Sequence, residues 1–504
     1  MAQQQKFSPA VDDLVNEGAY KVLAIATALE ATGRKVVHLE IGQPDYPTPQ
    51  HIVDAGVGAL HAGQTTYTNP SGTLELREAI AARVAETRAV PVAADQVVVG
   101  PGAKPGLFFC TMALLSPGDE AVVPDPGFPT YANMVRACGG VTVPVPLTMG
   151  AGSTGSMYDM AALEAAVSAK TRLLVVCSPS NPTGGVISEA DLARLAALAA
   201  KWPRLYVLSD EIYSELVYDL ETAEDAADAP AAERPCAPSL LAAAHRMGGA
   251  EGAALVERII LLDGFSKTYC MTGWRLGFAV MAAPLAARVH LLMTHAIGCT
   301  AMFTQAVGVA ALADAGGAST AALADMRAEY RLRRDFVVGA LSAMEGVSCL
   351  TPQGAFYAFP DVSALLGEGS CVRSSAELAT RLLNEGGVAL LPGTDFGASG
   401  EGFLRISYVR DMATLEDGMA RVAKVLAAVR EENSKLCAVV ISAPSYSYSC
   451  TRTAKIKWVF YSILLRTIEA SPFITHDTCL QASRSAAGWA DRARLGGHGQ
   501  AAVG

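Results

Sequence analysis

The sequence has no pair of cysteines at the C-x-x-C spacing of zinc sites and redox motifs, although it contains 11 cysteines among its 504 residues. The cysteines are scattered along the chain, without the dense spacing of a disulfide-stapled domain. This usage is typical of reduced thiols inside a cell. It predicts neither a disulfide framework nor a metal site.

Long basic runs and long apolar runs are also missing. The formal net charge is -10 at pH 7, which argues against a surface for nucleic acid. The first six residues lack the apolar core of a secretion signal, and the apolar patch at 458–465 is much shorter than the roughly 20 residues that span a bilayer. We therefore expect a soluble, cytoplasmic protein that binds neither nucleic acid nor membrane.

Hydrophobic residues make up 51% of the chain, which is enough for large cores. Because the length exceeds that of a usual single domain, we expect two domains with extensions. The predicted parts are an N-terminal arm with part of a small domain (1–48), a large domain (49–310), a small C-terminal domain (311–433) and an irregular tail (434–504). Residues 219–252, rich in Ala, Asp, Glu and Pro, predict a partly flexible surface insertion.

Short apolar runs alternate with helical periodicity from residue 96 onward. The predicted strands span 96–99, 120–123, 141–145, 172–177, 205–209, 258–262 and 276–281. This alternation predicts an α/β fold with a mostly parallel mixed sheet that helices cover on both faces. Ligands of such sheets bind at the carboxyl ends of the strands, which is where the polar motifs of this chain lie.

The stretch Gly264–Gly277 (GFSKTYCMTGWRLG) carries a lysine and an arginine directly after a predicted strand. A lysine at a strand end in apolar surroundings is costly to keep charged, so we expect a lowered pKa for Lys267. A neutral lysine is a nucleophile towards aldehydes. The alternative is that Lys267 extends its amine to solvent beside a structural Arg275.

Three further motifs follow predicted strands. The glycine-rich GPGAKPG at 100–106 opens a helix whose free N–H groups suit a phosphate. Asn181, in SNPTGG at 180–185, presents an amide suited to a ring oxygen, and Asp210, in SDEIY at 209–213, is a buried carboxylate that needs a cation such as a pyridinium. The ordinary alternatives are a glycine turn that binds nothing, a helix-capping turn and a structural salt bridge.

Together these motifs meet the needs of pyridoxal 5'-phosphate (PLP), which uses a Schiff-base lysine and a carboxylate at its pyridine nitrogen. Phe128, in PGFP at 126–129, is placed to stack on the ring.

The same motifs resemble those of class I PLP-dependent aminotransferases of the aspartate aminotransferase type (PLP fold type I), closest to the bacterial-type subgroup. The resemblance covers about residues 30–430, in family order. Its matching segments are GQPD at 42–45, YTNPSG at 67–72, GAK at 102–104, NPTG at 181–184, DEIY at 210–213, SK at 266–267 with Arg275, and FLRIS at 403–407. It implies an aminotransferase that moves an amino group between an L-amino acid and a 2-oxo acid, with a large PLP-binding domain and a smaller α/β domain.

The resemblance also implies roles for single residues. Lys267 joins the cofactor and moves the proton, Asp210 pairs with the pyridine nitrogen, and Tyr213 contacts the ring hydroxyl. The implied cofactor-binding set is Gly102, Ala103, Lys104, Phe128, Asn181, Asp210, Tyr213, Ser266, Lys267, Arg275 and Tyr67. The implied substrate-binding set is Gly42, Asn181 and Arg405, in which the guanidinium of Arg405 clamps the α-carboxylate.

Tyr67 resembles a tyrosine that reaches the phosphate of the neighbouring subunit, which implies a homodimer with shared sites. One residue departs from the pattern: Gly264 stands where some relatives carry a serine on the phosphate, and Ser266 is the candidate to replace it.

In the expected mechanism, Lys267 takes the α-proton of the substrate while Asp210 keeps the pyridine nitrogen protonated. A 2-oxo acid leaves, and a second 2-oxo acid reverses the cycle. The alternatives are a C–S lyase or synthase on the same fold and a non-catalytic binding protein. The sequence does not choose among aspartate, alanine and aromatic donors.

The tripeptide Ser434-Lys435-Leu436 follows the matched region and is a peroxisomal address when it stands at a C-terminus. A shorter product ending at Leu436 would therefore be peroxisomal. Chance occurrence of the tripeptide is the alternative.

Overall fold

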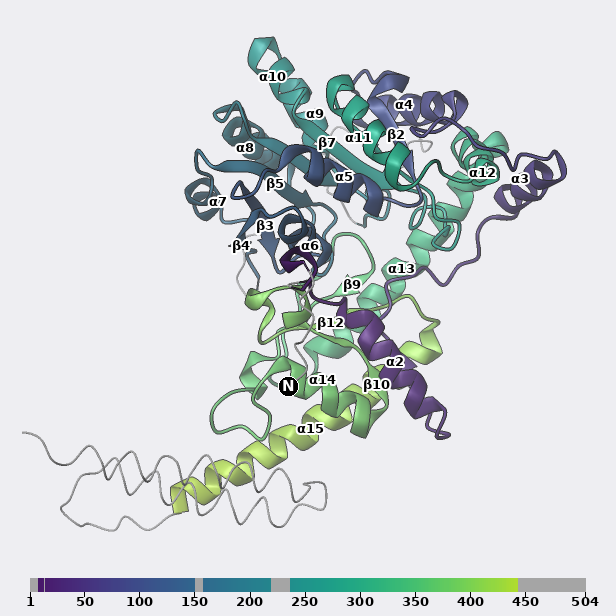
Figure 1. Ribbon diagram of the computed structural model, residues 1–504. Coiled ribbons are helices and arrows are strands. Elements are labelled where there is room, and N and C mark those ends of the chain that lie inside the picture. The colour runs from purple at the N-terminus through teal and green to yellow at the C-terminus, as the bar shows by residue number, and fades with distance from the viewer. Residues whose placement is uncertain (1–7, 13, 150–156, 219–235, 443–504) are drawn as a thin grey trace, which may run out of the picture. The chain divides into compact units, whose positions relative to one another are not determined.

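The computed structural model describes residues 8–12, 14–149, 157–218 and 236–442 (Figure 1). Residues Met1–Ala438 form one compact unit, and its central element is a seven-stranded sheet. The strands are β2 (Val97–Gly100), β3 (Glu120–Asp125), β4 (Val141–Pro146), β5 (Thr171–Cys177), β6 (Tyr206–Asp210), β7 (Ile259–Gly264) and β8 (Gly277–Val280). All seven predicted strands are present, with their ends shifted by at most two residues.

The strands run in the order β2-β8-β7-β6-β5-β3-β4. Only β8 runs in the direction opposite to the other six strands, which confirms the predicted mostly parallel mixed sheet. Because β5, β6 and β7 are adjacent and parallel, their carboxyl ends lie at one edge. The segments that carry Asn181, Asp210 and Lys267 leave the sheet from this edge.

Alternate residues of each strand face opposite sides of the sheet. In β5, Leu173 and Val175 pack into one apolar core, whereas Leu174 and Val176 pack into another. The first core is covered by α5 (Lys104–Leu114), α6 (Thr130–Ala137) and α11 (Ala283–Ala296). The second is covered by α3 (Gln50–His61), α4 (Leu74–Arg88), α7 (Met160–Ala166), α8 (Glu189–Ala200), α9 (Leu240–Met247), α10 (Gly249–Val256) and α12 (Met302–Ala313). Helices therefore cover both faces, as predicted.

A further core is built mainly from the segments after α12. Strands β11 (Leu391–Pro392), β12 (Leu404–Ser407) and β9 (Tyr357–Ala358) form an antiparallel sheet in that order, and β1 (Val37–His38) pairs in parallel with β10 (Val388–Ala389). The helices α13 (Ala318–Ser342), α14 (Ser375–Arg381) and α15 (Met412–Ser442) pack on this core. The change of core falls between Ala311 and Leu323, a few residues after the predicted boundary at 310. Helices α1 (Pro9–Asp12) and α2 (Gly18–Glu30) precede β1.

Two predictions about irregular segments are wrong in part. The second half of the predicted insertion 219–252 holds α9 and α10, because the first five residues of α9, from Leu240 to Ala244, are buried in the core. Helix α15 continues to Ser442, so residues 434–442 are helical where an irregular tail was expected. The ion pair of Lys435 with Glu431, at 2.7 Å, supports the helix there. Residues 219–235 and 443–504 lie outside the described residues.

Among the described residues, no single helix is long and apolar enough to cross a membrane. The bent pair α12 and α13 meets the criterion by length and composition, and both helices contribute buried residues to the cores. The eight cysteines whose side chains are described are free thiols, and the same part of the chain holds no group of three or more metal-ligating side chains.

Candidate active site

Lys267 lies shortly after the end of β7, at the edge of the sheet where β5 and β6 also end. Its Nζ donates a hydrogen bond to the backbone carbonyl of Gly42, at 2.7 Å. The rings of Tyr213 and Phe356 flank the amine, with centroids 5.9 and 5.7 Å from Nζ. The lysine that the sequence singled out is thus held among aromatic side chains.

Burial lowers the pKa of Lys267 to about 8. This value already includes the positive charges of Arg405, Arg275 and Lys104, which also lower the pKa, and the carboxylate of Asp210, which raises it. The predicted lowering is confirmed in direction and in its first cause. An amine with this pKa has a substantial neutral fraction near neutral pH, as a nucleophile or a general base requires.

Asp210 is the last residue of β6, and its side chain is buried. Its carboxylate accepts hydrogen bonds from the hydroxyl of Tyr131 at 2.6 Å and from the backbone N–H of Ile212 at 3.3 Å. Burial raises the pKa of Asp210 to about 6, although both hydrogen bonds oppose the rise. A carboxylate buried in this way gains most from a cationic partner, and a pyridinium N–H is such a partner.

Tyr131 was not predicted from the sequence. It lies on α6, and its ring packs edge-on against Phe128 with centroids 5.7 Å apart. The available signal is its position one turn after Phe128, whose carbonyl accepts a hydrogen bond from the N–H of Tyr131 at 3.0 Å. Nothing in the sequence indicates that Tyr131 meets Asp210.

Arg405 and Asn181 meet although 224 residues separate them. Arg405 projects from β12, and its Nη1 donates to the side-chain oxygen of Asn181 at 3.3 Å, while Nη2 donates to the backbone carbonyl of Glu40. The Nε of Arg405 is buried and has no hydrogen-bond partner within the described residues. A buried guanidinium with an unused N–H is suited to receive a carboxylate.

Burial lowers the pKa of Arg405, and two aromatic rings hold its guanidinium. The centroids of Tyr357 and Phe396 lie 4.5 and 5.0 Å from Cζ. Neither ring belongs to a motif recognised in the sequence. Both take their place only once β9 and the segment after β11 fold against β12.

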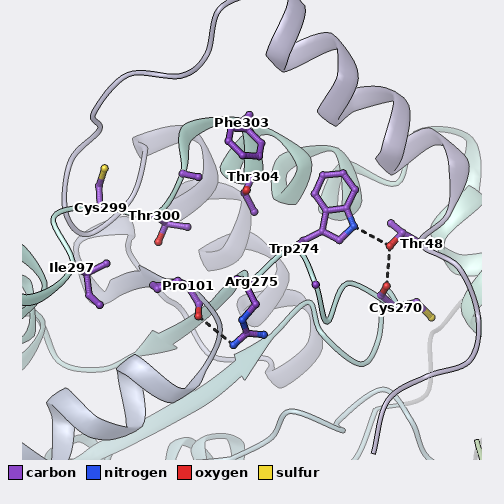
Figure 2. Close-up of a pocket in the computed structure, with 12 residues that line it drawn as sticks. Thr48, Pro101, Cys270, Trp274, Arg275, Ile297, Cys299, Thr300, Phe303 and Thr304 are labelled. Carbon is purple, nitrogen blue, oxygen red and sulfur yellow. Dashed lines mark hydrogen bonds between the residues drawn. The ribbon is translucent and has the colours of Figure 1, made fainter. Parts of the chain in front are cut away.

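Gly102, Ala103 and Lys104, which are expected to hold a phosphate, lie where β2 turns into α5. Arg275, which precedes β8, bonds to Pro101 of this turn (Figure 2). Arg275 donates to the carbonyl of Pro101 at 3.3 Å and to that of Thr272 at 2.9 Å. Gly102 has a φ of +93°, and a Cβ there would lie 2.4 Å from Nη2 of Arg275. The guanidinium therefore lies beside Gly102, two residues before the start of α5, and a cation next to a helix N-terminus suits an anion.

The departure at Gly264 has a packing reason. A Cβ at this position would lie 2.9 Å from the Cα of Gly277, because β7 and β8 approach closely there. A serine would therefore push these strands apart. Ser266 is buried next to Lys267 in the chain.

Lys104, at the start of α5, lies 5.2 Å from the centroid of the Phe128 ring. Its ammonium group is about half exposed and is paired with the carboxylate of Glu17, which also accepts a hydrogen bond from Thr130. The residues before α2 are thereby attached to the mouth of the site. Nothing in the sequence indicates this contact of Glu17.

The side chain of Tyr67 is 94% exposed and does not pack into the site of its own chain. Lys104 and Arg275 are the other exposed side chains among the predicted site residues. A cavity of about 720 Å³ opens beside Arg275 and is lined by residues that include Thr48, Trp274, Cys299 and Phe303 (Figure 2). The backbone N–H of Thr68 donates to the sulfur of Cys299 at 3.5 Å, which places the Tyr67 loop at the edge of this cavity.

The site fits PLP in each respect that its residues can test. It offers an amine with a lowered pKa, a buried carboxyl group with a raised pKa, and a glycine-lined helix start below an arginine.

The chain matches the family model for aminotransferases of class I and II over residues 34–422. It is 34% identical over 427 residues to the bifunctional aspartate aminotransferase and glutamate/aspartate-prephenate aminotransferase of Petunia hybrida, over 84% of this chain and 83% of the relative. It is 36% identical over 432 residues to the aspartate aminotransferase of Streptomyces avermitilis, over 85% of this chain and 98% of the relative.

Solved structures agree. The aspartate aminotransferase from Thermus thermophilus with maleate aligns with a TM-score of 0.73 and 32% identity, over 84% of this chain and 100% of that chain. The family match spans most of the sequence, and the fold and the relatives agree with it. The chain therefore belongs to the class I and II aminotransferases, and it is a PLP-dependent enzyme that transfers amino groups.

Proposed function

We propose that this aminotransferase takes its amino group from a dicarboxylic amino acid, aspartate first, and passes it to a 2-oxo acid. The observation that carries the proposal is the set of three cations that lower the pKa of Lys267, namely Arg405, Arg275 and Lys104. The loaded site has three anionic groups to match them when the substrate has two carboxylates: the cofactor phosphate and one carboxylate at each end of the substrate.

Lys104 is the cation proposed for the second carboxylate. Arg275 suits the phosphate and Arg405 suits the α-carboxylate, which leaves Lys104 at the mouth of the site. Its present partner, Glu17, is itself a carboxylate, so a substrate carboxylate would exchange with a group of the same kind. Two relatives carry aspartate in their names, and one neighbouring structure holds maleate, a four-carbon dicarboxylate.

The proposed division of labour follows the geometry. PLP, when bound, supplies an electron sink for the substrate α-carbon. With PLP bound, Lys267 would hold the cofactor and accept the α-proton at Nζ, and Asp210 would pair with the pyridine nitrogen. Tyr213 and Asn181 would hold the ring hydroxyl, and Arg405 would orient the substrate beside Gly42. The phosphate is assigned to Gly102, Ala103, Ser266 and Arg275, which leaves Lys104 for the second carboxylate, and the ring face is assigned to Phe128.

We further propose a homodimer in which Tyr67 completes the site of the partner subunit. The support is that Tyr67 is 94% exposed at the edge of the cavity beside Arg275, the residue assigned to the phosphate. Analytical ultracentrifugation of the wild type and of Tyr67→Ala, with PLP affinity as a second readout, tests the shared site.

The boundaries near residues 48, 310 and 433 are proposed as domain limits on the basis of the separate cores.

For location we propose the cytoplasm. The tripeptide 434–436 lies inside α15, which continues to Ser442, and it acts as a peroxisomal address only at a C-terminus. Mass spectrometry of the native C-terminus tests this, because a product ending at Leu436 would instead support the peroxisome.

A matrix of donors and acceptors tests the substrate proposal. We expect aspartate and glutamate to exceed alanine and phenylalanine in kcat/KM with 2-oxoglutarate as acceptor. Prephenate belongs in the acceptor set because the name of one relative includes it. Lys104→Met should raise KM for aspartate by about tenfold, because one charge-assisted bond is lost. It should leave KM for alanine within about twofold of the wild-type value.

The exposed Lys201, paired with Glu164 on another face, offers the matched control Lys201→Met. Equal loss for aspartate and alanine in Lys104→Met would overturn the dicarboxylate proposal. Release of pyruvate and ammonia without an acceptor would point to the lyase alternative, which no finding favours.

A further inference from the structure

Tyr357 lies between residues to which the proposed function gives separate tasks. It belongs to β9, and its side chain is buried. Its hydroxyl lies 2.8 Å from the hydroxyl of Tyr213, and its ring centroid lies 4.5 Å from Cζ of Arg405. One side chain thus contacts both the residue assigned to the cofactor hydroxyl and the residue assigned to the substrate carboxylate.

The register of the small sheet explains the contact with Arg405. Tyr357 stands opposite Ser407 of β12, and Arg405 lies two residues before Ser407. Side chains two residues apart on a strand project from the same face. The backbone pairing of β9 and β12 therefore places the ring of Tyr357 and the guanidinium of Arg405 on the same face of the sheet, close to each other.

The ring leaves the guanidinium little freedom. Tyr357 and Phe396 both lie within 5.0 Å of Cζ, and Nη1 and Nη2 bond to Asn181 and Glu40. A guanidinium is planar, so a ring against it defines the plane in which its remaining N–H groups point. The Nε of Arg405, which has no partner among the described residues, is directed by this packing.

The hydroxyl of Tyr357 meets two further parts of the site. A Cβ on Gly42 would lie 2.0 Å from this hydroxyl, so the two groups are in direct contact. The carbonyl of the same Gly42 accepts the hydrogen bond of Lys267. Within the part of the chain that the structure describes, the hydroxyl of Tyr213 has Tyr357 as its one side-chain partner.

We propose that Tyr357 is a positioning residue with two separable tasks: its ring sets the plane of Arg405, and its hydroxyl holds that of Tyr213. The inference rests on the proposed roles of Arg405 and Tyr213. Since one rigid ring carries both contacts, the orientation of the carboxylate clamp and that of the cofactor contact are linked. A purely structural tyrosine would serve neither task selectively.

Two variants separate the tasks. Tyr357→Phe keeps the ring and removes the hydroxyl, whereas Tyr357→Leu removes both. The readouts are the affinity of the apoprotein for PLP, the absorbance maximum of bound PLP, and kcat and KM for aspartate.

We expect Tyr357→Phe to weaken PLP binding by about fivefold, the effect of one lost hydrogen bond, and to keep KM within about twofold of wild type. Tyr357→Leu should show the same loss of PLP affinity and an increase in KM of about tenfold from the lost stacking. A KM that stays near the wild-type value in Tyr357→Phe but rises in Tyr357→Leu would show that the ring, and not the hydroxyl, orients Arg405.

A double variant tests the hydroxyl pair. If the hydroxyl acts through Tyr213, then Tyr213→Phe with Tyr357→Phe should weaken PLP binding no more than Tyr213→Phe alone, because the two changes remove the same interaction. Additive losses, or an unchanged PLP affinity in Tyr357→Phe, would overturn this half of the inference. An increase in KM that is equal in the phenylalanine and leucine variants would overturn the other half.

Two controls keep the outcomes distinguishable. Tyr218 is a buried tyrosine of the same core whose hydroxyl donates to the carbonyl of Ala355, so Tyr218→Phe should lower thermal stability without changing PLP affinity. Arg405→Lys tests the clamp itself. An unchanged KM in Arg405→Lys refutes the proposed function at this residue. A raised KM there, with no change in Tyr357→Leu, refutes only the inference about Tyr357.

Discussion

The hydroxyl of Tyr131 lies 2.6 Å from the carboxylate of Asp210 and donates a hydrogen bond to it. The bond opposes the effect of burial, which raises the pKa of Asp210 to about 6. Tyr131 thus helps to keep ionised a group that the apolar surroundings favour as the neutral acid.

Replacing Tyr131 with phenylalanine should raise the pKa of Asp210 further. The protonated acid cannot pair with a pyridinium, so the acidic limb of the profile of kcat/KM against pH should move to higher pH, by roughly one pH unit. Steady-state rates between pH 5 and 9 measure the shift. Tyr206→Phe, on β6 but stacked on Arg172, is the matched control. An acidic limb that stays at the same pH in Tyr131→Phe would show that Tyr131 does not affect the protonation state of Asp210.

Attachment of PLP to the apoprotein should become faster as pH rises through about 8, the pKa to which burial and the nearby cations lower that of Lys267. Only the neutral amine is nucleophilic, and its fraction grows as pH passes the pKa. Stopped-flow absorbance after mixing apoprotein with PLP measures the rate. Lys267→Ala, which has no amine, should bind PLP without this phase and lack transaminase activity. A rate that is flat between pH 6 and 9 would contradict the lowered pKa.

Gly42→Ala should damage both stability and activity. The added methyl group would lie 2.0 Å from the hydroxyl of Tyr357, so the backbone or the ring has to move, at a cost of about 1–3 kcal/mol. Movement of this backbone also disturbs the bond from Lys267. Denaturant unfolding and kcat/KM are the measurements.

The control is Gly58→Ala in α3, where a methyl group meets nothing within 4 Å. It should be neutral or stabilising by up to about 1 kcal/mol, since alanine favours a helix over glycine. Equal behaviour of the two variants would show that the space beside Gly42 is larger than the structure indicates.

Arg88→Leu should cost about 3–5 kcal/mol of stability, because it leaves the buried carboxylates of Glu211 and Asp263 without their cation. The bonds from Arg88 are 2.9 Å to Glu211 and 3.3 Å to Asp263. Burial raises the pKa of Asp263 to about 7 even with Arg88 opposing the rise. Without Arg88 the folded-state pKa rises further above the unfolded value, so ionisation penalises folding more at high pH.

The loss in Arg88→Leu should therefore be larger at pH 8 than at pH 5.5, and unfolding curves at the two values measure the difference. Arg194, a largely exposed partner of Asp191, provides the control: Arg194→Leu should cost less than about 1 kcal/mol at either pH. A loss that does not change with pH would argue against ionised carboxylates in this cluster.

The sequence predicts the sheet and the residues at its edge because each strand is a short apolar run followed at once by a polar motif. Lys267, Asp210 and Asn181 are found in this way, and the structure places all three at one edge. Arg405 is found only through the family resemblance, since a lone arginine on a short strand has no local signal.

Tyr131, Tyr357 and Glu17 were not predicted, because each takes its place through tertiary packing. Tyr357 depends on the register of β9 and β12, and Glu17 depends on where the segment before α2 crosses the site. The alanine-rich composition of α9 and α10 resembles a linker and so predicts an insertion, whereas burial of Leu240–Ala244 in the core decides the structure of α9.

The attachment of Glu17 to Lys104 has a consequence for selectivity. In the resting enzyme this ammonium group already has an anionic neighbour from its own chain, so an incoming dicarboxylate must displace Glu17 before it binds Lys104. A substrate with a neutral side chain has no carboxylate with which to displace Glu17 from Lys104. The N-terminal segment would thus compete with the substrate for Lys104. It lowers the affinity for incoming acids, and by binding Lys104 again it promotes product release after each turnover.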